Sequence, residues 1–353
     1  RDLPQEEIDR LLAEGVPYVI RQKMPIEGST SFTDAVFGEI TVENTELQDQ
    51  ILIKTDGYPT YNFANVIDDH TMGITHVVRG CEYLSSTPKY NLLYEAFGWE
   101  IPTYIHLPLI MGKDADGNVS KLSKRHGATG FYDLIDEGYL PEAIINYIAL
   151  LGWCPKDNQE IFTLKELEKA FDISGISKSP AVFDYDKLSW FNGEYIKAMT
   201  PEKFTEVAMP YYKKVFGDKH MPYEKFAAIL QKRTTQLTQI PEMLDFFAEL
   251  PSYTKELFVN KKSKTNLENS PVVLKEAYDR LKAMPEWNET SIHDCLINMA
   301  VEKELKNGTV MWPVRIAAAG KTVTPGGAVE ILDILGRDES LARLEKGMAI
   351  LAE

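Results

Sequence analysis

The sequence predicts an α/β part followed by an all-helical part, and three observations support this division. A strand, a helix and a second strand follow one another at 75–79, 88–97 and 103–111, an order typical of parallel α/β architecture. From residue 201 onward, apolar residues recur almost only at helical spacing. The charge also changes, because residues 1–200 carry 17 Lys and Arg against 31 Asp and Glu, whereas residues 201–353 carry 21 against 22.

The composition is that of a folded protein from a reducing compartment. Of 353 residues, 44% are apolar and 26% charged, which suits two or three domains and excludes disordered or collagen-like classes. No stretch approaches the ~18 apolar residues that span a bilayer, so we expect no membrane partner. Cys81, Cys154 and Cys295 are far apart and form no C-x-x-C pair, which favours a cytoplasmic protein over a disulfide or zinc scaffold. The net charge of −15 attracts a polyanion poorly at long range but permits local basic surfaces.

The elements of the first part can be placed in order. Pro4, Glu6 and Gly15 mark a short helix over 4–15. β-rich segments broken by turns follow at 18–23, 38–42 and 50–54, before the strand, helix and strand already described.

Helices are predicted for the rest of the chain. A polar loop over 112–118 precedes a cationic segment, and beyond Thr129 the pattern turns helical at 140–151 and 164–171. Two amphipathic faces, over 292–305 and 341–351, are the clearest helical signals after residue 201.

The strongest chemical signal is the string Lys121-Leu122-Ser123-Lys124-Arg125, with three cations in five residues. Ligands of parallel sheets bind outside the carboxyl ends of the strands, so a mobile cationic loop here is well placed for phosphates. Such cations can stabilise the charge that develops on a leaving pyrophosphate. Taken alone, the string is also compatible with a solvated basic loop.

The string resembles the K-M-S-K-S loop of class I aminoacyl-tRNA synthetases, in the K-[LI]-S-K-R form of the glutamyl enzymes. Residues 56–70, D-G-Y-P-T-Y-N-F-A-N-V-I-D-D-H, are similar to the D-G-x-P-T-Y-x-x-A-x-V-x-D-D stretch of the same family. Further similar segments lie at the family spacing: Thr75–Gly80, Ser86–Pro88, Gly138–Ala143, Asn146–Tyr147, Leu151–Trp153, Phe183–Asp184 and Lys187–Asn192. The sequence is therefore identified as a member of the bacterial glutamyl-tRNA synthetase family. Matching segments are frequent through residue 200 and fewer beyond it.

The resemblance implies the C-terminal half of a Rossmann catalytic domain, followed by helical stem-contact and anticodon-binding domains. It implies four parts: the end of an acceptor-binding insertion (1–50), the second half of the Rossmann domain (51–110), the K-L-S-K-R loop with a stem-contact domain (111–200), and an all-helical anticodon-binding region (201–353), divisible into 201–250 and 251–353. The H-I-G-H-type motif of the family does not occur in the sequence. We therefore expect this chain alone to be catalytically incomplete, with the missing part upstream of Arg1.

The activity that the resemblance implies is that of a glutamate–tRNA ligase, which activates L-glutamate with ATP and Mg²⁺ and transfers it to the 3′ end of tRNA(Glu). We expect a monomer. We also expect no structural metal, because the six histidines never fall at ligand spacing and Asp68-Asp69 fits a turn or cap better than a metal pair. Two alternatives stay open: an enzyme that also charges tRNA(Gln), and a catalytically silent tRNA-binding module. A tRNA-modifying paralogue fits less well, because such relatives lack the helical part.

The family assigns glutamate contacts to the positions of Tyr61, Asn65 and Arg79. Arg79, at the end of a predicted strand, can offer two parallel donors to the side-chain carboxylate. Tyr61 and Asn65 are four residues apart and share one face if their segment is helical. A surface ion pair for Arg79 and core packing for Tyr61 are the alternative explanations.

The resemblance assigns catalysis to Lys121 and Lys124. The expected ATP-binding residues are these two lysines with Ser123, Arg125, Ile110 and Glu82. Ile110 ends a segment similar to the strand whose backbone contacts the adenine ring, whereas Cys81, before Glu82, departs from the family pattern. Arg233 matches a position implicated in reading the anticodon, and an exposed helix arginine is its alternative explanation.

Overall fold

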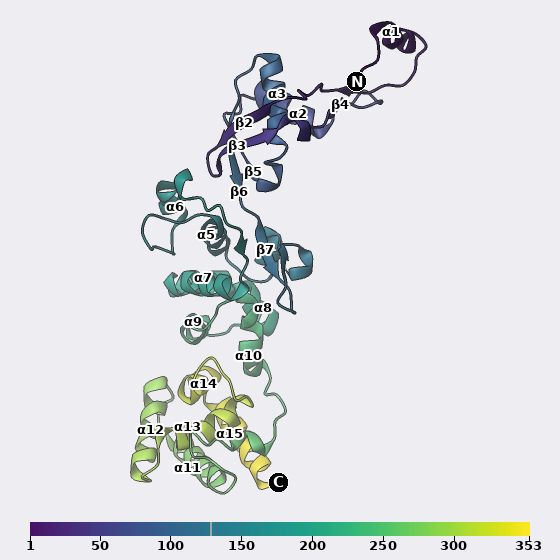
Figure 1. Cartoon of the computed structure of the whole chain (residues 1–353). Coiled ribbons are helices and arrows are strands. Elements are labelled where there is room, and N and C mark those ends of the chain that lie inside the picture. Colours follow the sequence, from purple (N-terminus) through teal and green to yellow (C-terminus); the bar gives the residue numbers. More distant parts are fainter. Residues whose placement is uncertain (128) are drawn as a thin grey trace. The chain divides into compact units, whose positions relative to one another are not determined.

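The computed structural model describes residues 1–127 and 129–353, apart from the side chain of Arg125. The chain forms two compact units, and helix α5 (Pro141–Gly152) contributes to both (Figure 1). The first unit comprises residues 1–129 and 145–184, and the second comprises residues 130–144 and 185–353.

The first unit contains a four-stranded sheet with the strand order β3-β2-β6-β5. Its strands are β2 (Ser29–Asp34), β3 (Gly38–Glu43), β5 (His76–Gly80) and β6 (Thr103–Leu107). β5 and β6 are parallel, with Arg79 opposite His106, and β2 joins β6 in parallel at Asp34 and Tyr104. The predicted parallel architecture is confirmed for β5 and β6. β2 and β3, from the first 50 residues, lie in the same sheet, and β2 was not predicted.

Two helices lie beside this sheet, α2 (Tyr61–Thr71) and α3 (Thr87–Phe97) (Figure 1). They share a small core that includes Val66 and Tyr90. The predicted helix over 88–97 is confirmed. The predicted turn or cap at Asp68-Asp69 is wrong, because both residues lie within α2, which continues to Thr71.

The strand predicted over 103–111 is two strands in different sheets, because Pro108 lies between them and has no N–H to continue a ladder. The second of these, β7 (Ile110–Lys113), pairs antiparallel with β8 (Val119–Lys121) and parallel with β9 (Ala181–Val182). The predicted loop over 112–118 is therefore largely a hairpin turn. The Asp114 carboxylate closes it by accepting the backbone N–H groups of Asp116 and Asn118 at 3.0 and 2.8 Å.

Smaller elements complete the first unit. They are α1 (Gln5–Ala13), β1 (Ile20–Arg21), β4 (Ile51–Ile53), α6 (Leu164–Ala170) and short 3₁₀ turns at Asn44–Glu46, Cys81–Tyr83, Lys124–His126 and Ile173–Gly175. The predicted helix at 4–15 is confirmed. The predicted strands at 18–23 and 50–54 are confirmed as the short antiparallel pair β1-β4.

The second unit is helical throughout the part that the structure describes. Its helices are α4 (Phe131–Asp136), the start of α5, α7 (Tyr185–Ala198), α8 (Pro201–Phe216), α9 (Tyr223–Leu230), α10 (Ile240–Ala248), α11 (Asn269–Ala283), α12 (Glu289–Glu302), α13 (Asn307–Ala319), α14 (Ala328–Leu335) and α15 (Arg337–Ala352), with 3₁₀ turns at Leu237–Gln239 and Lys255–Phe258. One continuous apolar core runs through these helices. The predicted all-helical character and both amphipathic faces, on α12 and α15, are confirmed.

Asn192 on α7 connects three segments of this unit. Its fully buried amide accepts the Leu140 backbone N–H at 2.8 Å and donates to the Thr235 carbonyl at 2.7 Å. Nearby, Gly138 has a φ of +90°, and a Cβ atom there would lie 2.6 Å from the Thr238 backbone nitrogen. Glycine is required here by both its conformation and the close approach of the second chain segment.

Replacing Asn192 by alanine is expected to lower the free energy of unfolding of the second unit by about 2–3 kcal/mol, because a buried N–H and a buried carbonyl lose their partners. Urea unfolding followed by circular dichroism measures the change. Ser189→Ala on the same helix is the control, since it removes only a bond to the Tyr139 hydroxyl. Equal stability of the two variants would contradict the connecting role of Asn192.

Candidate active site

Arg79 lies at the end of β5 in an aromatic pocket. Its Nε donates toward His106 Nε2 at 3.4 Å, and its Nη2 donates to Thr87 Oγ1 at 3.1 Å. Three tyrosine rings surround the guanidinium, with centroids 4.6 to 5.5 Å from its carbon atom: Tyr83, Tyr90 and Tyr104. Within the described chain, no carboxylate forms an ion pair with Arg79. The predicted alternative of a surface ion pair is therefore not observed, and the cation remains available to an acidic ligand.

The segment of Tyr61 and Asn65 is helical, in α2, so the condition under which their spacing puts them on one face is met. The Tyr61 ring is 61% exposed and lies 6.2 Å from the ring of Tyr83, which also contacts Arg79. Tyr61 is therefore a surface residue of the pocket and not a core residue.

The amide oxygen of Asn65 is an acceptor that a bound ligand could use. Oδ1 is buried and, among the described residues, has no hydrogen-bond partner. Burial raises the pKa of the nearby Tyr90 hydroxyl, while the charge of Arg79 opposes the rise. A buried acceptor without a partner is uncommon in folded proteins, and an ammonium group of a ligand would satisfy it.

The structure brings together two predicted nucleotide-binding residues that are 39 positions apart. Lys121, at the end of β8, places Nζ 3.2 Å from Glu82 Oε1. Hydrogen bonds from its own backbone N–H and then from Lys121 hold the pKa of Glu82 below its ordinary value. The carboxylate folds over Gly80, where a Cβ atom would lie only 2.0 Å from Glu82 Oε2. A larger residue at position 80 would therefore push the Glu82 carboxylate away from its observed place.

The rest of the cationic string is held close to β7. The Ile110 carbonyl, expected near the adenine, accepts the Leu122 N–H at 3.0 Å. The Ser123 N–H donates to His126 Nδ1 at 3.0 Å, and the imidazole lies so close to Gly112 that a Cβ there would be 2.7 Å from it.

Lys124 and Arg125 complete the string. The Lys124 side chain is exposed and makes no ion pair with any part of the chain that the structure describes. The predicted ATP contact of Arg125 concerns a side chain that lies outside the described residues. Lys124 is therefore free to contact a phosphate group.

Three functional candidates were not predicted from the sequence. His126 anchors the cationic string, Thr87 binds Arg79, and Asp34 binds His106. Thr87 and His106 stand in segments that match the family, but their bonds depend on the fold. Asp34 stands 72 residues before its partner, and no motif marked it.

Neither a metal cluster nor a membrane span was found in the described residues. No group of three or more His, Cys, Asp or Glu side chains is placed there to hold a metal ion. No helix is both long enough and apolar enough to cross a bilayer.

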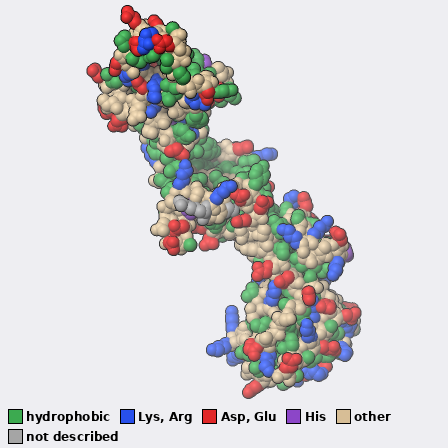
Figure 2. Space-filling view, turned by 90° about the vertical axis from the view of Figure 1, so that its right-hand side faces the viewer, with side chains coloured by type: hydrophobic (Ala, Val, Ile, Leu, Met, Phe, Trp, Pro, Cys, Tyr) green, Lys and Arg blue, Asp and Glu red, His purple; other side chains and the backbone are tan. Residues whose placement is uncertain are grey.

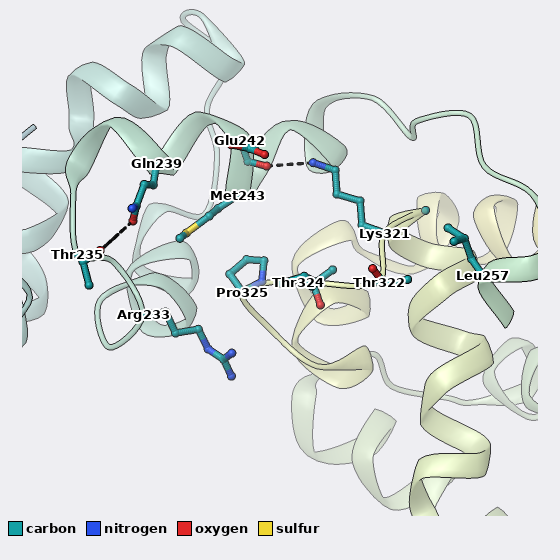
Figure 3. A pocket seen from close by; sticks show the side chains of 12 residues that line it. Arg233, Thr235, Gln239, Glu242, Met243, Leu257, Lys321, Thr322, Thr324 and Pro325 are labelled. Carbon is teal, nitrogen blue, oxygen red and sulfur yellow. Dashed lines mark hydrogen bonds between the residues drawn. The ribbon is translucent and has the colours of Figure 1, made fainter. Parts of the chain in front are cut away.

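Arg233 borders a cavity of about 850 Å³ in the second unit (Figure 3). It lies in the turn after α9 and not in a helix, so the alternative of an exposed helix arginine is wrong about its location. Thr235 and Gln239 lie on one side of the cavity and the segment 320–325 on the other, where Lys321 pairs with Asp245 at 2.6 Å.

A second arginine lies close to Arg233. Burial lowers the pKa of Arg315, and the charge of Arg233 lowers it further. Elsewhere on the second unit, charged side chains of both signs are interspersed over the face in Figure 2, in line with its nearly balanced charge. Arg315 does not line the cavity, but it donates hydrogen bonds to Thr322 and Thr324, which do.

The Rossmann-like sheet and the cationic hairpin define a class I tRNA synthetase, and the family model described as "tRNA synthetases class I (E and Q), catalytic domain" matches residues 1–190. The model of an "Anticodon binding domain" matches residues 203–348. The chain belongs to the glutamate–tRNA ligase family.

Named relatives support this assignment. The glutamate–tRNA ligase of Clostridium kluyveri is 56% identical over 346 residues, which make up 98% of this chain and 70% of the relative. That of Clostridium botulinum (strain Loch Maree) is 55% identical, with the same coverage.

Solved structures agree. The crystal structure of a glutamate tRNA ligase from Elizabethkingia meningosepticum, in complex with its amino acid, has a TM-score of 0.86 and 34% identity, covering 99% of this chain and 72% of that one. The glutamate-tRNA synthetase of Elizabethkingia anophelis gives a TM-score of 0.85 at 33% identity, covering 98% of this chain and 71% of that one.

Proposed function

We propose that the protein activates L-glutamate with ATP and transfers it to the 3′ end of tRNA(Glu). The observation that carries this proposal is the guanidinium of Arg79, which is surrounded by tyrosines and makes no ion pair in the described chain. A guanidinium in this setting suits a carboxylate better than a neutral side chain, because it offers charge and parallel donors together.

The bound amino acid has two ends, and different residues hold them in this proposal. Arg79 binds the side-chain carboxylate. Asn65 accepts a hydrogen bond from the α-ammonium group through its buried Oδ1, and the exposed Tyr61 hydroxyl orients the same end. The α-carboxylate is then left free to react.

In the first step, an α-carboxylate oxygen attacks the α-phosphorus of ATP, and pyrophosphate leaves. Lys121 and Lys124 stabilise the negative charge that develops on this leaving group. Glu82 holds Lys121 beside the strand end until the nucleotide binds, while Ile110, Ser123 and Arg125 complete the nucleotide site. In the second step, a hydroxyl of the terminal adenosine attacks the activated carbonyl and AMP leaves. Neither step needs a covalent enzyme intermediate, because positioning and charge stabilisation suffice.

We further propose that ATP enters with Mg²⁺ bound to its phosphates, that the protein is a monomer, and that it works in the cytoplasm. Magnesium is commonly held by substrate phosphates with few protein ligands. The three cysteines are unpaired, which suits a reducing compartment. Residues 1–50 would contact the acceptor end of the tRNA and 111–200 its stem, while the anticodon-binding family match supports that role for 201–353.

The test is pyrophosphate exchange and tRNA charging, measured with tRNA present. Both are measured on a protein that spans the full length of the relatives, because a chain without the H-I-G-H-type motif is expected to be catalytically incomplete. We expect exchange that depends on glutamate, and charging of tRNA(Glu) but not tRNA(Gln). Charging of both tRNAs would establish the non-discriminating alternative. Salt-dependent tRNA binding without exchange would establish the silent module. Equal use of aspartate or glutamine would contradict the proposed substrate.

Arg233→Ala is expected to lower kcat/KM for tRNA charging by roughly 10-fold or more, the usual effect of losing one good contact to a base. The KM for glutamate at saturating tRNA should stay the same, because Arg233 belongs to the second unit, whereas the proposed glutamate contacts all belong to the first. Lys232→Ala is the matched control, since it removes a neighbouring exposed cation. Equal effects of both variants would reduce Arg233 to a general electrostatic role.

A further inference from the structure

Two buried polar side chains, Asp34 and His106, form a row that leads to the Nε edge of Arg79. Asp34 and His106 are 1% and 0% exposed, and His106 Nδ1 lies 2.7 Å from Asp34 Oδ2. The Asp34 carboxylate also accepts three backbone N–H groups, from Val36, Phe37 and His106, at 2.8 to 3.0 Å. Asp34 is thus fixed by its own turn and by the neighbouring strand, and it presents one oxygen to the imidazole.

This arrangement determines the tautomer of His106. Because a carboxylate can only accept, the proton of the imidazole is assigned to Nδ1. Burial lowers the pKa of His106, although Asp34 opposes the shift, so the neutral ring is favoured. The lone pair of Nε2 then points toward Arg79 and accepts its Nε–H, at 3.4 Å.

Thr87 binds Nη2 of the same guanidinium, next to the Nε that faces His106. Its hydroxyl oxygen lies 3.1 Å from Arg79 Nη2, 3.3 Å from His106 Nε2 and 3.0 Å from the Tyr83 carbonyl. His106 and Thr87 therefore occupy the fork formed by Nε and Nη2. The tyrosine rings pack around the group. The other pair of donors, the end-on fork of Nη1 and Nη2, is not occupied by any described residue.

We propose that Asp34 and His106 are positioning residues that hold Arg79 by its Nε edge, so that the end-on fork receives the side-chain carboxylate of glutamate. This inference rests on the proposed function. It identifies Asp34 and His106 as the residues that orient Arg79, which selects the amino acid. A fork with two fixed donors matches two carboxylate oxygens, whereas the amide of glutamine presents only one acceptor and an NH₂ group that faces a donor. The fixed fork therefore favours glutamate over glutamine.

Asp34→Asn tests the tautomer. The new amide can donate to Nδ1, and the imidazole proton then moves to Nε2. There it faces the Arg79 Nε–H, so that two donors oppose each other. Loss of the correct tautomer by such a replacement is known to be severe in other buried Asp–His pairs. ¹⁵N NMR of the His106 imidazole is expected to show the proton on Nδ1 in the wild type and on Nε2 in the variant.

His106 is tested by a pair of variants. His106→Leu removes the acceptor at similar volume, while the longer amide of His106→Gln can place an oxygen where Nε2 lies. We expect His106→Leu and Asp34→Asn to weaken glutamate binding by roughly 10- to 100-fold, with the KM for ATP within about twofold. His106→Gln should recover most of the loss. His70→Leu, which removes an exposed histidine of the same unit, is the control.

Glutamate affinity by calorimetry and tRNA charging are measured separately for each variant, together with its melting temperature. Weakened glutamate binding in His106→Leu, recovered in His106→Gln, supports the inference even if the wild-type protein does not charge tRNA. That absence of charging would overturn the proposed function and not the inference. Unchanged glutamate affinity in both His106→Leu and Asp34→Asn overturns the inference even if charging is normal. Equal loss of ATP and glutamate binding, following the melting temperature, also overturns it, because that pattern reports a structural role.

Discussion

Arg79→Ala is expected to lower kcat/KM for glutamate by an amount that corresponds to about 3–5 kcal/mol in transition-state stabilisation. The variant leaves the carboxylate of the substrate unpaired in a pocket lined by tyrosine rings. Burial raises the pKa of Tyr104 and of Tyr90, so neither of these two phenols carries a charge. They cannot hydrate the carboxylate as water would, so the loss is large.

Pyrophosphate exchange over a range of glutamate concentrations, with tRNA present, measures this loss. Arg79→Lys is the companion variant, because it keeps the charge but offers no planar fork. We expect it to recover only part of the activity and to discriminate less well between glutamate and glutamine. Near-normal activation of glutamate by Arg79→Ala would remove Arg79 from the site.

Lys124→Ala is expected to reduce kcat for activation by roughly 10²-fold or more, comparable to the loss of one preorganised donor. Lys121 is already paired with Glu82, whereas Lys124 makes no ion pair with a described residue and can follow the charge as it forms on pyrophosphate. The effect should fall on kcat and not on the KM for ATP, since the interaction is stronger in the transition state.

Single-turnover activation of glutamate measures the chemical step directly. Lys113→Ala is the matched control, because this lysine is exposed on β7 of the same hairpin but lies outside the cationic string. A Lys124→Ala variant with a higher KM for ATP and an intact kcat would refute the assigned role. Similar losses in both variants would point to the charge of the hairpin as a whole.

Local patterns predicted many of the elements of this protein, although they missed β2 and the extent of α2. Helical periodicity predicted an all-helical region after residue 200 and marked the faces on α12 and α15. The spacing of four put Tyr61 and Asn65 on one face on the condition that their segment was helical, and α2 meets that condition. These properties depend on neighbours within one or two turns, and the sequence contains them. The predicted strand over 103–111 was also wrong, because the missing N–H of Pro108 ends one strand and lets the next begin in a different sheet.

The contacts that make a site were decided by tertiary structure. The sequence marked Lys121, Glu82 and Arg79 as single residues, but not that Lys121 pairs with Glu82 or that Arg79 lies among three tyrosines. It gave no sign that Asp34 supports His106, because the two meet only through the parallel pairing of β2 with β6. Partners so far apart in the chain leave no periodic trace in it, so only the folded sheet brings the carboxylate, the imidazole and the guanidinium into one row.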